Sequence, residues 1–384
     1  MQGGLPPAPF SLPHFDSAYL NGGSPFNWDP NSGLEPYMQQ FTFSVQRYLP
    51  RHFFVDGTYV GQKGNRLTGN QDNWNQLPAS YMTTYGSLLS QPFDSPAAIA
   101  ASIRAPYPGF TGTVGQALRP FPQYASITPR FDPSGMSWYN ALQVQVRKQM
   151  GNLQMQLNFT QMKNLSNTRA GQFSNSGGTN VDTYHLALEK APVRFESSRT
   201  MVLMWLYDLP VGRGKRFASR AHGPVNQVIG GWQLGAIQTY KNGQNLVIAG
   251  GVPNPIFNVS FRPNRLSGVP VKLAGCEHPG IGVGPLLNIN AFASNNALQL
   301  GNAPPLLPER GCGWLGEDFN VQKNFPIKES TRFEFRSEFY NLFNRTKWAD
   351  PSVNINSPAT FGRILGVDGR YQARTIQFGL KLIW

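Results

Sequence analysis

The sequence predicts an all-β fold: the antiparallel up-and-down transmembrane β-barrel portion of a larger barrel, with about nine strands and long extracellular loops. Three observations predict this fold. Apolar and polar residues alternate in runs long enough to span a bilayer, the connections alternate between short and long, and the composition favours turns over charge. The chain has 40 Gly and 32 Pro among 384 residues, and only 14% of its residues are charged, whereas about 25% is usual in soluble domains.

The clearest alternation runs from Thr331 to Asn344 and reads TRFEFRSEFYNLFN. Successive strand residues point to opposite faces, so one face carries Phe333, Phe335, Ser337 and Phe339, and the other carries Arg332, Glu334, Arg336 and Glu338. A charge facing lipid costs ~2–4 kcal/mol at the bilayer midplane. We therefore expect the four charged residues to face the lumen and the three phenylalanines to face lipid. The alternatives that the charges contact substrate or only line a solvated lumen stay open.

The same alternation predicts nine strands, at Phe41–Leu49, Phe53–Gly61, Trp138–Met150, Asn152–Lys163, Thr200–Leu209, Gly231–Lys241, Asp318–Phe325, Thr331–Asn344 and Arg374–Trp384. A single run of this kind is better explained as a strand of a soluble sandwich. Together the runs favour a membrane barrel, because their length approaches the ~9–11 residues of membrane strands. Their connections also alternate between short turns and long loops. The connection Pro210–Gly230 is long for an inner turn.

These strands divide the chain into two parts. We expect residues 1–40 to be the remnant of an extracellular loop and residues 41–384 to be the C-terminal part of an outer-membrane β-barrel, with long outer loops at about 62–137, 164–199, 242–317 and 345–373. An open sheet has unpaired edges that hydrocarbon does not tolerate, so the strands are expected to be a fragment of a closed barrel. The N-terminus MQGGLPPAPFSLPHF lacks the features of a signal peptide; either the true start is missing or the chain is not exported.

The net charge of +13 and the isoelectric point near 9.8 raise the question of a nucleic-acid partner. Basic residues are nevertheless scattered, and the densest run, Arg213, Lys215, Arg216 and Arg220, lies in a Gly-containing connection. No basic stripe is interleaved with aromatic residues, so we expect no nucleic-acid binding. The basic run is expected to be a solvated turn or a contact with anionic lipid headgroups. No apolar stretch approaches the ~18 residues that a transmembrane helix needs.

The two cysteines, Cys276 and Cys312, both lie in the long connection between the sixth and seventh predicted strands. An outer loop faces an oxidising compartment, so a disulfide between them is the preferred interpretation. A metal site formed by Cys276, His278 and Cys312 is the weaker alternative, because no fourth ligand is near. Glycine-rich segments lack a strand–turn–helix context, and no Ser or Cys stands in a nucleophile motif. We expect no cofactor and no enzymatic activity.

Ten segments between Phe41 and Trp384 follow one another in a familiar order: FTFSVQRYLPRHFFVDGTYVGQKGNRL, RPFPQYASI, SWYNALQVQVRKQM, LNFTQMKN, LYDLPVGRGKRF, GGWQLGAIQTYKNGQ, RPNRLSG, FNVQKNFPI, RFEFRSEFYNLFN and INSPATFGRI with IQFGLKLIW. No single segment is diagnostic. As an ordered set they resemble the C-terminal portion of the barrel of Oar-like TonB-dependent transporters of the acidobacterial type, which usually carry a carboxypeptidase-regulatory-like domain.

The resemblance implies an outer-membrane transporter or receptor of a Gram-negative bacterium that moves a bulky ligand. It implies a plug inside a barrel of about 22 strands, energy from the TonB complex acting through an N-terminal part that this chain lacks, and contact with outer-membrane lipids. The resemblance also implies that Phe378, Leu380, Leu382 and Trp384 form the C-terminal signal read by the barrel-assembly machinery, with Trp in place of the commoner Phe. The alternative function is a surface or adhesion protein whose long loops bind polysaccharide or a partner. The sequence does not identify the ligand.

Overall fold

The computed structural model describes residues 22–69, 73–149, 151–168, 180–194, 196–252, 262–276, 280–296, 298–327, 331–370 and 372–384. Nine long strands dominate this part of the chain: β2 (Tyr37–Leu49), β3 (Phe53–Leu67), β5 (Gly135–Lys148), β6 (Leu153–Ser166), β8 (Arg199–Asp208), β9 (Trp232–Lys241), β12 (Trp314–Pro326), β13 (Arg332–Tyr340) and β14 (Thr375–Ile383).

The nine long strands form one antiparallel sheet in which each strand pairs with its neighbours in the chain. The order β14-β13-β12-β9-β8-β6-β5-β3-β2 leaves β14 and β2 at the two edges, and β7 (Ala191–Pro192) adds a short pairing to β6. This is an up-and-down meander, and the sheet is not closed into a barrel. The predicted fold, an antiparallel up-and-down portion of a transmembrane β-barrel, is confirmed in strand number and order.

Several strand ends differ from the prediction. β2 begins at Tyr37, because its pairing with β3 extends as far as Asn65, and β3 continues to Leu67, which pairs with Gly135 of β5. β12 begins at Trp314, where Trp314 pairs with Lys241. β13 ends at Tyr340 rather than at Asn344, because Asn341 has a positive φ of 52° and its backbone N–H donates to Asp318 Oδ1 at 2.8 Å. Met150, the predicted end of a strand, lies outside the described residues.

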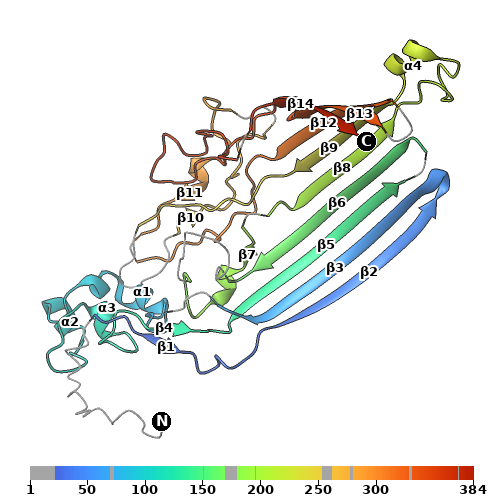
Figure 1. Ribbon diagram of the computed structural model, residues 1–384. Coiled ribbons are helices and arrows are strands. Elements are labelled where there is room, and N and C mark those ends of the chain that lie inside the picture. Colours follow the sequence, from blue (N-terminus) through green and yellow to red (C-terminus); the bar gives the residue numbers. More distant parts are fainter. Residues whose placement is uncertain are drawn as a thin grey trace, which may run out of the picture.

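The connections sort to the two ends of the sheet (Figure 1). The described parts of the shorter connections, 50–52, 149–152, 209–231 and 327–331, lie at one end, which we call the turn end, and they include the 3-10 helix η2 (Pro50–His52) and α4 (Gly223–Ile229). The described parts of the long connections 68–134, 167–198, 242–313 and 341–374 gather at the opposite end with residues 22–36, and we call this assembly the cap. Small elements of the cap are β1 (Phe26–Trp28), α1 (Ser80–Tyr85), η3 (Gly86–Ser90), α2 (Pro96–Ala100), α3 (Val114–Ala117), β4 (Thr128–Arg130), η4 (Leu186–Glu189), β10 (Asn264–Arg265), η5 (Ile289–Ala291) and β11 (Phe292–Ala293).

The hydrophobic cores of the described chain lie in the cap and not under the sheet. One core cluster contains Leu246, Ile248, Val271, Leu287, Ala291, Phe292, Leu307 and Phe361. The other contains Leu77, Leu89, Ala98 and Val114, with Leu298 and Leu300 packed against it from a different connection. Among the buried hydrophobic residues, Ala141 alone belongs to a long strand. A soluble sandwich would bury one face of the sheet, so this arrangement excludes the sandwich alternative.

Buried polar groups connect the loops of the cap. Asn75 donates to the carbonyl oxygens of Phe121 and Tyr124 at 2.9 and 2.6 Å, and Arg119 donates to the carbonyl oxygen of Asn75 at 3.2 Å. Between other connections, the buried Arg262 forms an ion pair with Glu189. Such buried polar groups must be partnered to be tolerated, so these bonds fix the connections relative to one another. None of the described helices is long and apolar enough to cross a membrane.

Candidate functional site

Backbone register assigns every residue of the long strands to one of two faces. Phe339 pairs with Phe319, Phe319 with Ala236, and Ala236 with Trp205. Following such pairs across all nine strands gives an apolar face that includes Phe41, Phe43, Val45, Val55, Tyr59, Val144, Val146, Met155, Leu157, Phe159, Leu203, Trp205, Leu234, Phe319, Val321, Phe333, Phe335, Phe339, Ile376, Phe378, Leu380 and Leu382.

The opposite face, which we call the polar face, includes Ser44, Gln46, Asp56, Thr58, Gln143, Gln145, Arg147, Gln154, Gln156, Asn158, Thr160, Asp318, Asn320, Gln322, Asn324, Gln377 and Lys381. Side chains bond to one another on it, as where Gln145 and Gln156 both donate to Asn158 Oδ1, at 3.0 and 3.1 Å. The alternation seen along single strands therefore continues across the whole sheet.

The predicted lumen-facing charges share the polar face. Arg336 Nε donates to Glu334 Oε1 at 2.6 Å, and Glu334 is buried. Glu338 Oε2 accepts a hydrogen bond from the Tyr340 hydroxyl at 3.1 Å. Arg332 lies at the start of β13 and pairs with Ile383. All four charges thus lie along β13 on the polar face, and Glu334, Arg336 and Glu338 have partners within the same strand.

The predicted lipid-facing phenylalanines share the apolar face with the C-terminal residues. Phe333 pairs with Leu382 and Phe335 with Leu380, while the Phe335 and Phe378 rings stack at a centroid distance of 6.4 Å. Leu380 is 71% exposed, although it lies well inside β14. Trp384 follows the end of β14 and is also exposed. These side chains form a continuous apolar surface without a protein layer on it.

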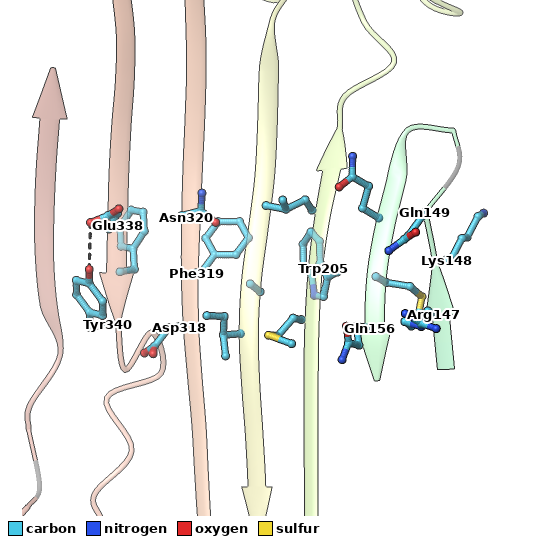
Figure 2. Close-up of a pocket in the computed structure, with 17 residues that line it drawn as sticks. Arg147, Lys148, Gln149, Gln156, Trp205, Asp318, Phe319, Asn320, Glu338 and Tyr340 are labelled. Atoms are coloured by element: carbon cyan, nitrogen blue, oxygen red, sulfur yellow. Dashed lines mark hydrogen bonds between the residues drawn. The ribbon is translucent and has the colours of Figure 1, made fainter. Parts of the chain in front are cut away.

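A groove of about 500 Å³ crosses the polar face at right angles to the strands (Figure 2). Two rows of paired residues line it. The first row contains Arg147, Gln156, Met204, Ile237 and Asp318, with Tyr340 beside it, and the second contains Gln154, Leu206, Asn320 and Glu338. Residues of the apolar face such as Trp205 and Phe319 contribute to the groove from the row between these two.

The groove has charge at both ends and an apolar middle. Arg147 supplies a cation at one end, and its guanidinium group lies 4.7 Å from the centre of the Phe54 ring. Asp318 and Glu338 supply carboxylates at the other end (Figure 2). Between them, the exposed side chains of Met204, Leu206 and Ile237 interrupt an otherwise polar surface. Such a surface matches an extended polar segment or ligand with an apolar centre and opposite charges at its ends.

Gly235 lets the side chains of its two neighbours in the second row approach each other. It pairs with Leu206 on one side and Asn320 on the other. A Cβ atom at this position would lie 2.1 Å from Asn320 Oδ1 and 2.7 Å from Leu206 Cδ2, so those side chains occupy the space that a larger residue would need. Glycine at this position therefore sets the shape of the floor of the groove.

The two cysteines are joined in the structure. The Cys276 and Cys312 sulfur atoms lie 2.08 Å apart and the Cα atoms 5.5 Å apart, within the range of a disulfide. His278, the third residue of the alternative metal site, lies outside the described residues. Within the described ranges, no cluster of three or more His, Cys, Asp or Glu side chains is placed to hold a metal ion.

Charged groups in the cap have shifted pKa values with clear causes. Burial lowers the pKa of Arg119 to about 10. The side chain of Arg370 donates to Asp368, and with Lys347 it lowers the pKa of Asp368 to about 2. Burial and the nearby charge of Asp368 raise the pKa of Asp350. In the cap, hydrogen bonds therefore stabilise the ionised form of Asp368, whereas burial destabilises the ionised form of Asp350.

Sequence reasoning missed the groove and one buried cation. The signal for the groove was Met201–Tyr207, which is apolar at every position and so places apolar side chains on both faces of β8. The signal for the cation was FNVQKNF, in which Lys323 falls in phase with Phe319, Val321 and Phe325 on the apolar face. Lys323 is almost fully buried and donates to two backbone carbonyl groups at the turn end.

An antiparallel up-and-down sheet with one apolar and one polar face is the arrangement found in membrane β-barrels. The family described as "Outer membrane beta barrel domain" matches residues 1–377, and the chain belongs to this family. The outer-membrane localisation predicted from the sequence is therefore confirmed. No curated protein matches the chain.

Several solved structures are similar to the chain. The outer membrane transporter YddB from Escherichia coli has 10% identity and a TM-score of 0.42, with 94% of this chain and 34% of that chain covered. The FrpB iron transporter (F3-3 variant) from Neisseria meningitidis has 9% identity, a TM-score of 0.37, and coverage of 93% and 32%. The ferric-catecholate import receptor Fiu from E. coli K12 has 9% identity, a TM-score of 0.36, and coverage of 90% and 28%. The chain spans about a third of these proteins or less.

Proposed function

We propose that this chain is a barrel segment of a TonB-dependent outer-membrane transporter of the Oar-like type, which moves a bulky ligand across the outer membrane. In this proposal the apolar face contacts lipid, the polar face lines the lumen, and the cap faces the outside and captures the ligand. The plug and the TonB box belong to other parts of the transporter, and the TonB complex acts through them. No catalytic step is part of the proposal.

The observation that carries the proposal is the inverted packing of the sheet. Large apolar residues such as Phe43, Phe378 and Leu380 are exposed on one face, while the polar groups of the other face bond to one another. In water such an apolar face would associate or aggregate. Against lipid tails it is the stable arrangement, and the charges of β13 then avoid the cost of facing hydrocarbon.

The groove gives the lumen a specific contact surface. Its two carboxylates, its single guanidinium group and its apolar middle are suited to a segment of the plug or to a part of the ligand that passes through the lumen. Because Leu206 and Asn320 occupy the space over Gly235, we expect Gly235→Leu to displace these side chains and to weaken that contact more than Gly57→Leu, a change at a glycine with open space around it. Energy-dependent ligand uptake by the two variants is the measurement.

A pair of adjacent residues in β14 tests the proposed topology. Leu380→Cys and Lys381→Cys are each labelled with a nitroxide in the full-length protein in outer-membrane vesicles. Power-saturation electron paramagnetic resonance is then measured with oxygen, which concentrates in lipid, and with a water-soluble nickel chelate. We expect the Leu380 label to respond to oxygen and the Lys381 label to the chelate. A Leu380 label that is accessible to neither reagent, or mainly to the chelate, contradicts the proposal.

A second candidate function rests on the cap. Its two hydrophobic cores and its disulfide make it a preformed surface, as expected for a surface or adhesion protein that binds polysaccharide or a partner. One experiment distinguishes transport from the surface function. Wild-type and deletion strains are grown with and without a protonophore, and mass spectrometry measures which solutes disappear from the medium. A large solute taken up only by energised wild-type cells supports transport. Unchanged depletion, with lost adhesion to polysaccharide-coated surfaces, supports the second function.

A further inference from the structure

The connection 209–231, which we call the basic turn, combines exposed cations with exposed apolar side chains. It contains Arg213, Lys215, Arg216 and Arg220 and no Asp or Glu. All four basic side chains are exposed, and within the described chain none of them forms a salt bridge. A concentrated positive charge without internal partners is available to an anionic surface.

The basic turn also contains exposed apolar side chains. Val225 and Val228 are three residues apart in α4, so they lie on the same side of the helix. Together with Pro224 and Ile229 they line a small, wholly apolar hollow. Phe217 is exposed as well, and the Arg216 guanidinium group lies 5.4 Å from the centre of its ring. Apolar residues next to arginines are typical of segments that lie in a membrane interface.

Hydrogen bonds hold the basic turn in one conformation. The backbone N–H of Arg213 donates to Asn226 Oδ1 at 2.7 Å, which ties the basic stretch to α4. The backbone N–H groups of Gly212 and Phe217 donate to the carbonyl oxygens of Phe217 and Pro210, both at 2.9 Å. The cations and the apolar residues therefore belong to one ordered unit.

Two residues of the apolar face of the sheet donate hydrogen bonds to the basic turn. Lys323 Nζ donates to the carbonyl oxygens of Val228 and Gly230 at 3.0 and 2.6 Å, and Trp232 Nε1 donates to that of Val228 at 2.9 Å. Lys323 and Trp232 pair with each other, and both belong to the apolar face. A cation on that face is tolerated near the bilayer interface, where its cost is far smaller than at the midplane. The C-terminal end of α4 is thus held at the level of the interface.

We propose that the basic turn is a docking surface for anionic phospholipid headgroups, with the four cations on the phosphates and Val225, Val228 and Phe217 inserted between the headgroups. This inference rests on the proposed function, because it takes the apolar face as lipid-facing and the turn end as periplasmic. The partner is then the phospholipid of the inner leaflet of the outer membrane. Docking fixes the depth of the sheet in the membrane at its turn end.

The experiment compares two matched reporters in the full-length protein. Val225→Cys and Ile99→Cys place an environment-sensitive fluorophore on short helices at opposite ends of the molecule, and the two native side chains are 59% and 64% exposed. Each protein is reconstituted in nanodiscs of phosphatidylcholine alone or with phosphatidylglycerol. We expect a blue shift of emission at position 225 when phosphatidylglycerol is present and no such shift at position 99.

Charge variants then test the cations. Replacing Arg213, Lys215, Arg216 and Arg220 together by Gln is expected to remove the phosphatidylglycerol-dependent shift, and each single replacement to weaken it by about fivefold. High salt should reduce the wild-type shift, because screening weakens exposed charges. A shift that is equal in both lipid mixtures, or unchanged in the fourfold variant, overturns the proposal.

A separate measurement shows whether failure lies in the proposed function instead. Intact cells are treated with a membrane-impermeant maleimide before and after permeabilisation of the outer membrane. We expect Ile99→Cys to react in intact cells and Val225→Cys to react only after permeabilisation. The reverse pattern overturns the proposed sidedness and with it the assignment to the inner leaflet, whereas the nanodisc result still decides whether the basic turn binds anionic phospholipid.

Discussion

The sheet and the cap bury their apolar residues in opposite ways. In the cap, side chains such as Leu77, Leu89 and Leu287 are enclosed, and buried polar groups such as Asn75 are hydrogen bonded. In the sheet, the large apolar residues of one face are exposed, and order comes from backbone pairing between neighbouring strands. This contrast within a single chain is what the proposed function requires, with the cap in water and the apolar face of the sheet against lipid.

Because of this difference, we expect a substitution in one region to affect that region and not the other. A change in a core of the cap should loosen the cap and leave strand pairing intact, because Ala141 is the only buried hydrophobic residue of the described long strands. A change on the apolar face should affect membrane insertion and leave the cap folded. We therefore expect the stability of the cap and the membrane insertion of the sheet to respond independently to substitution.

Leu287→Ala should destabilise the cap by about 2–5 kcal/mol, the usual cost of removing a buried leucine. Leu287 is 1% exposed and lies in the larger core. Hydrogen exchange should show lost protection in 242–313, while heat-modifiable migration of the sheet stays unchanged. Leu273→Ala, at an exposed position of the same connection, is the matched control and should change neither. Loss of heat-modifiable migration in Leu287→Ala would show that the two regions fold as one.

Leu380→Arg should destabilise the folded protein in phospholipid vesicles by about 2–4 kcal/mol, because it places a charge toward lipid. In water the same change at an exposed position would be nearly neutral. Urea titration in vesicles, followed by heat-modifiable migration, is the measurement. Gln377→Arg, on the polar face of the same strand, should cost much less. Equal effects of the two substitutions would remove the distinction between the faces.

Replacing Cys276 and Cys312 together by Ser should cost the cap roughly 2–4 kcal/mol, since the disulfide closes a loop with a sequence separation of 36. We expect faster proteolysis within 242–313 and no change in the sheet. Treating the wild-type protein with a reductant should reproduce the effect, and the Ser variant should not respond to it. Reductant sensitivity of heat-modifiable migration would argue against the separation.

The smallest expected effect is that of acid on the cap. Because the pKa of Asp368 is lowered to about 2 from a usual value of 3.8, its contribution to stability is present above about pH 4 and is lost as the pH falls toward 2. The group is partly exposed, so about 1 kcal/mol or less is expected. Protonation of Asp350, whose pKa is raised, acts in the opposite direction. The acid-induced increase in proteolysis of 341–374 should therefore be smaller in Asp368→Asn than in the wild type.

Sequence reasoning recovered the sheet because strand alternation is a local property. All nine long strands and the sorting of residues such as Phe333 and Arg336 onto opposite faces follow from a period of two residues, and the strand order follows from the alternation of short and long connections. The errors lie at strand ends, where side chains decide. Asp318 of β12 accepts from the backbone of Asn341, the first residue after β13, and no local pattern contains this contact.

The cap and the groove could not be predicted from the sequence, because both depend on contacts between residues that are distant in the chain. Leu298 packs against the core that contains Leu77, and Arg262 pairs with Glu189, although each contact joins separate connections. The register of five strands must be known before Arg147 and Asp318 are seen to share one row. Single-strand patterns carry no such information, which is why the site residues expected from the sequence were the two cysteines and residues of the last two strands and the C-terminus.

The separate cores of the cap have a consequence for how such proteins diversify. Because Leu298 and Leu300 reach from one connection into the core of another, a single loop cannot be exchanged without leaving a cavity in its neighbour. The strands themselves require only that each connection begin and end at fixed anchor points. Recombination between related genes should therefore succeed when it transfers the cap as a set, so that the outer surface diverges in blocks while the membrane-embedded residues change slowly.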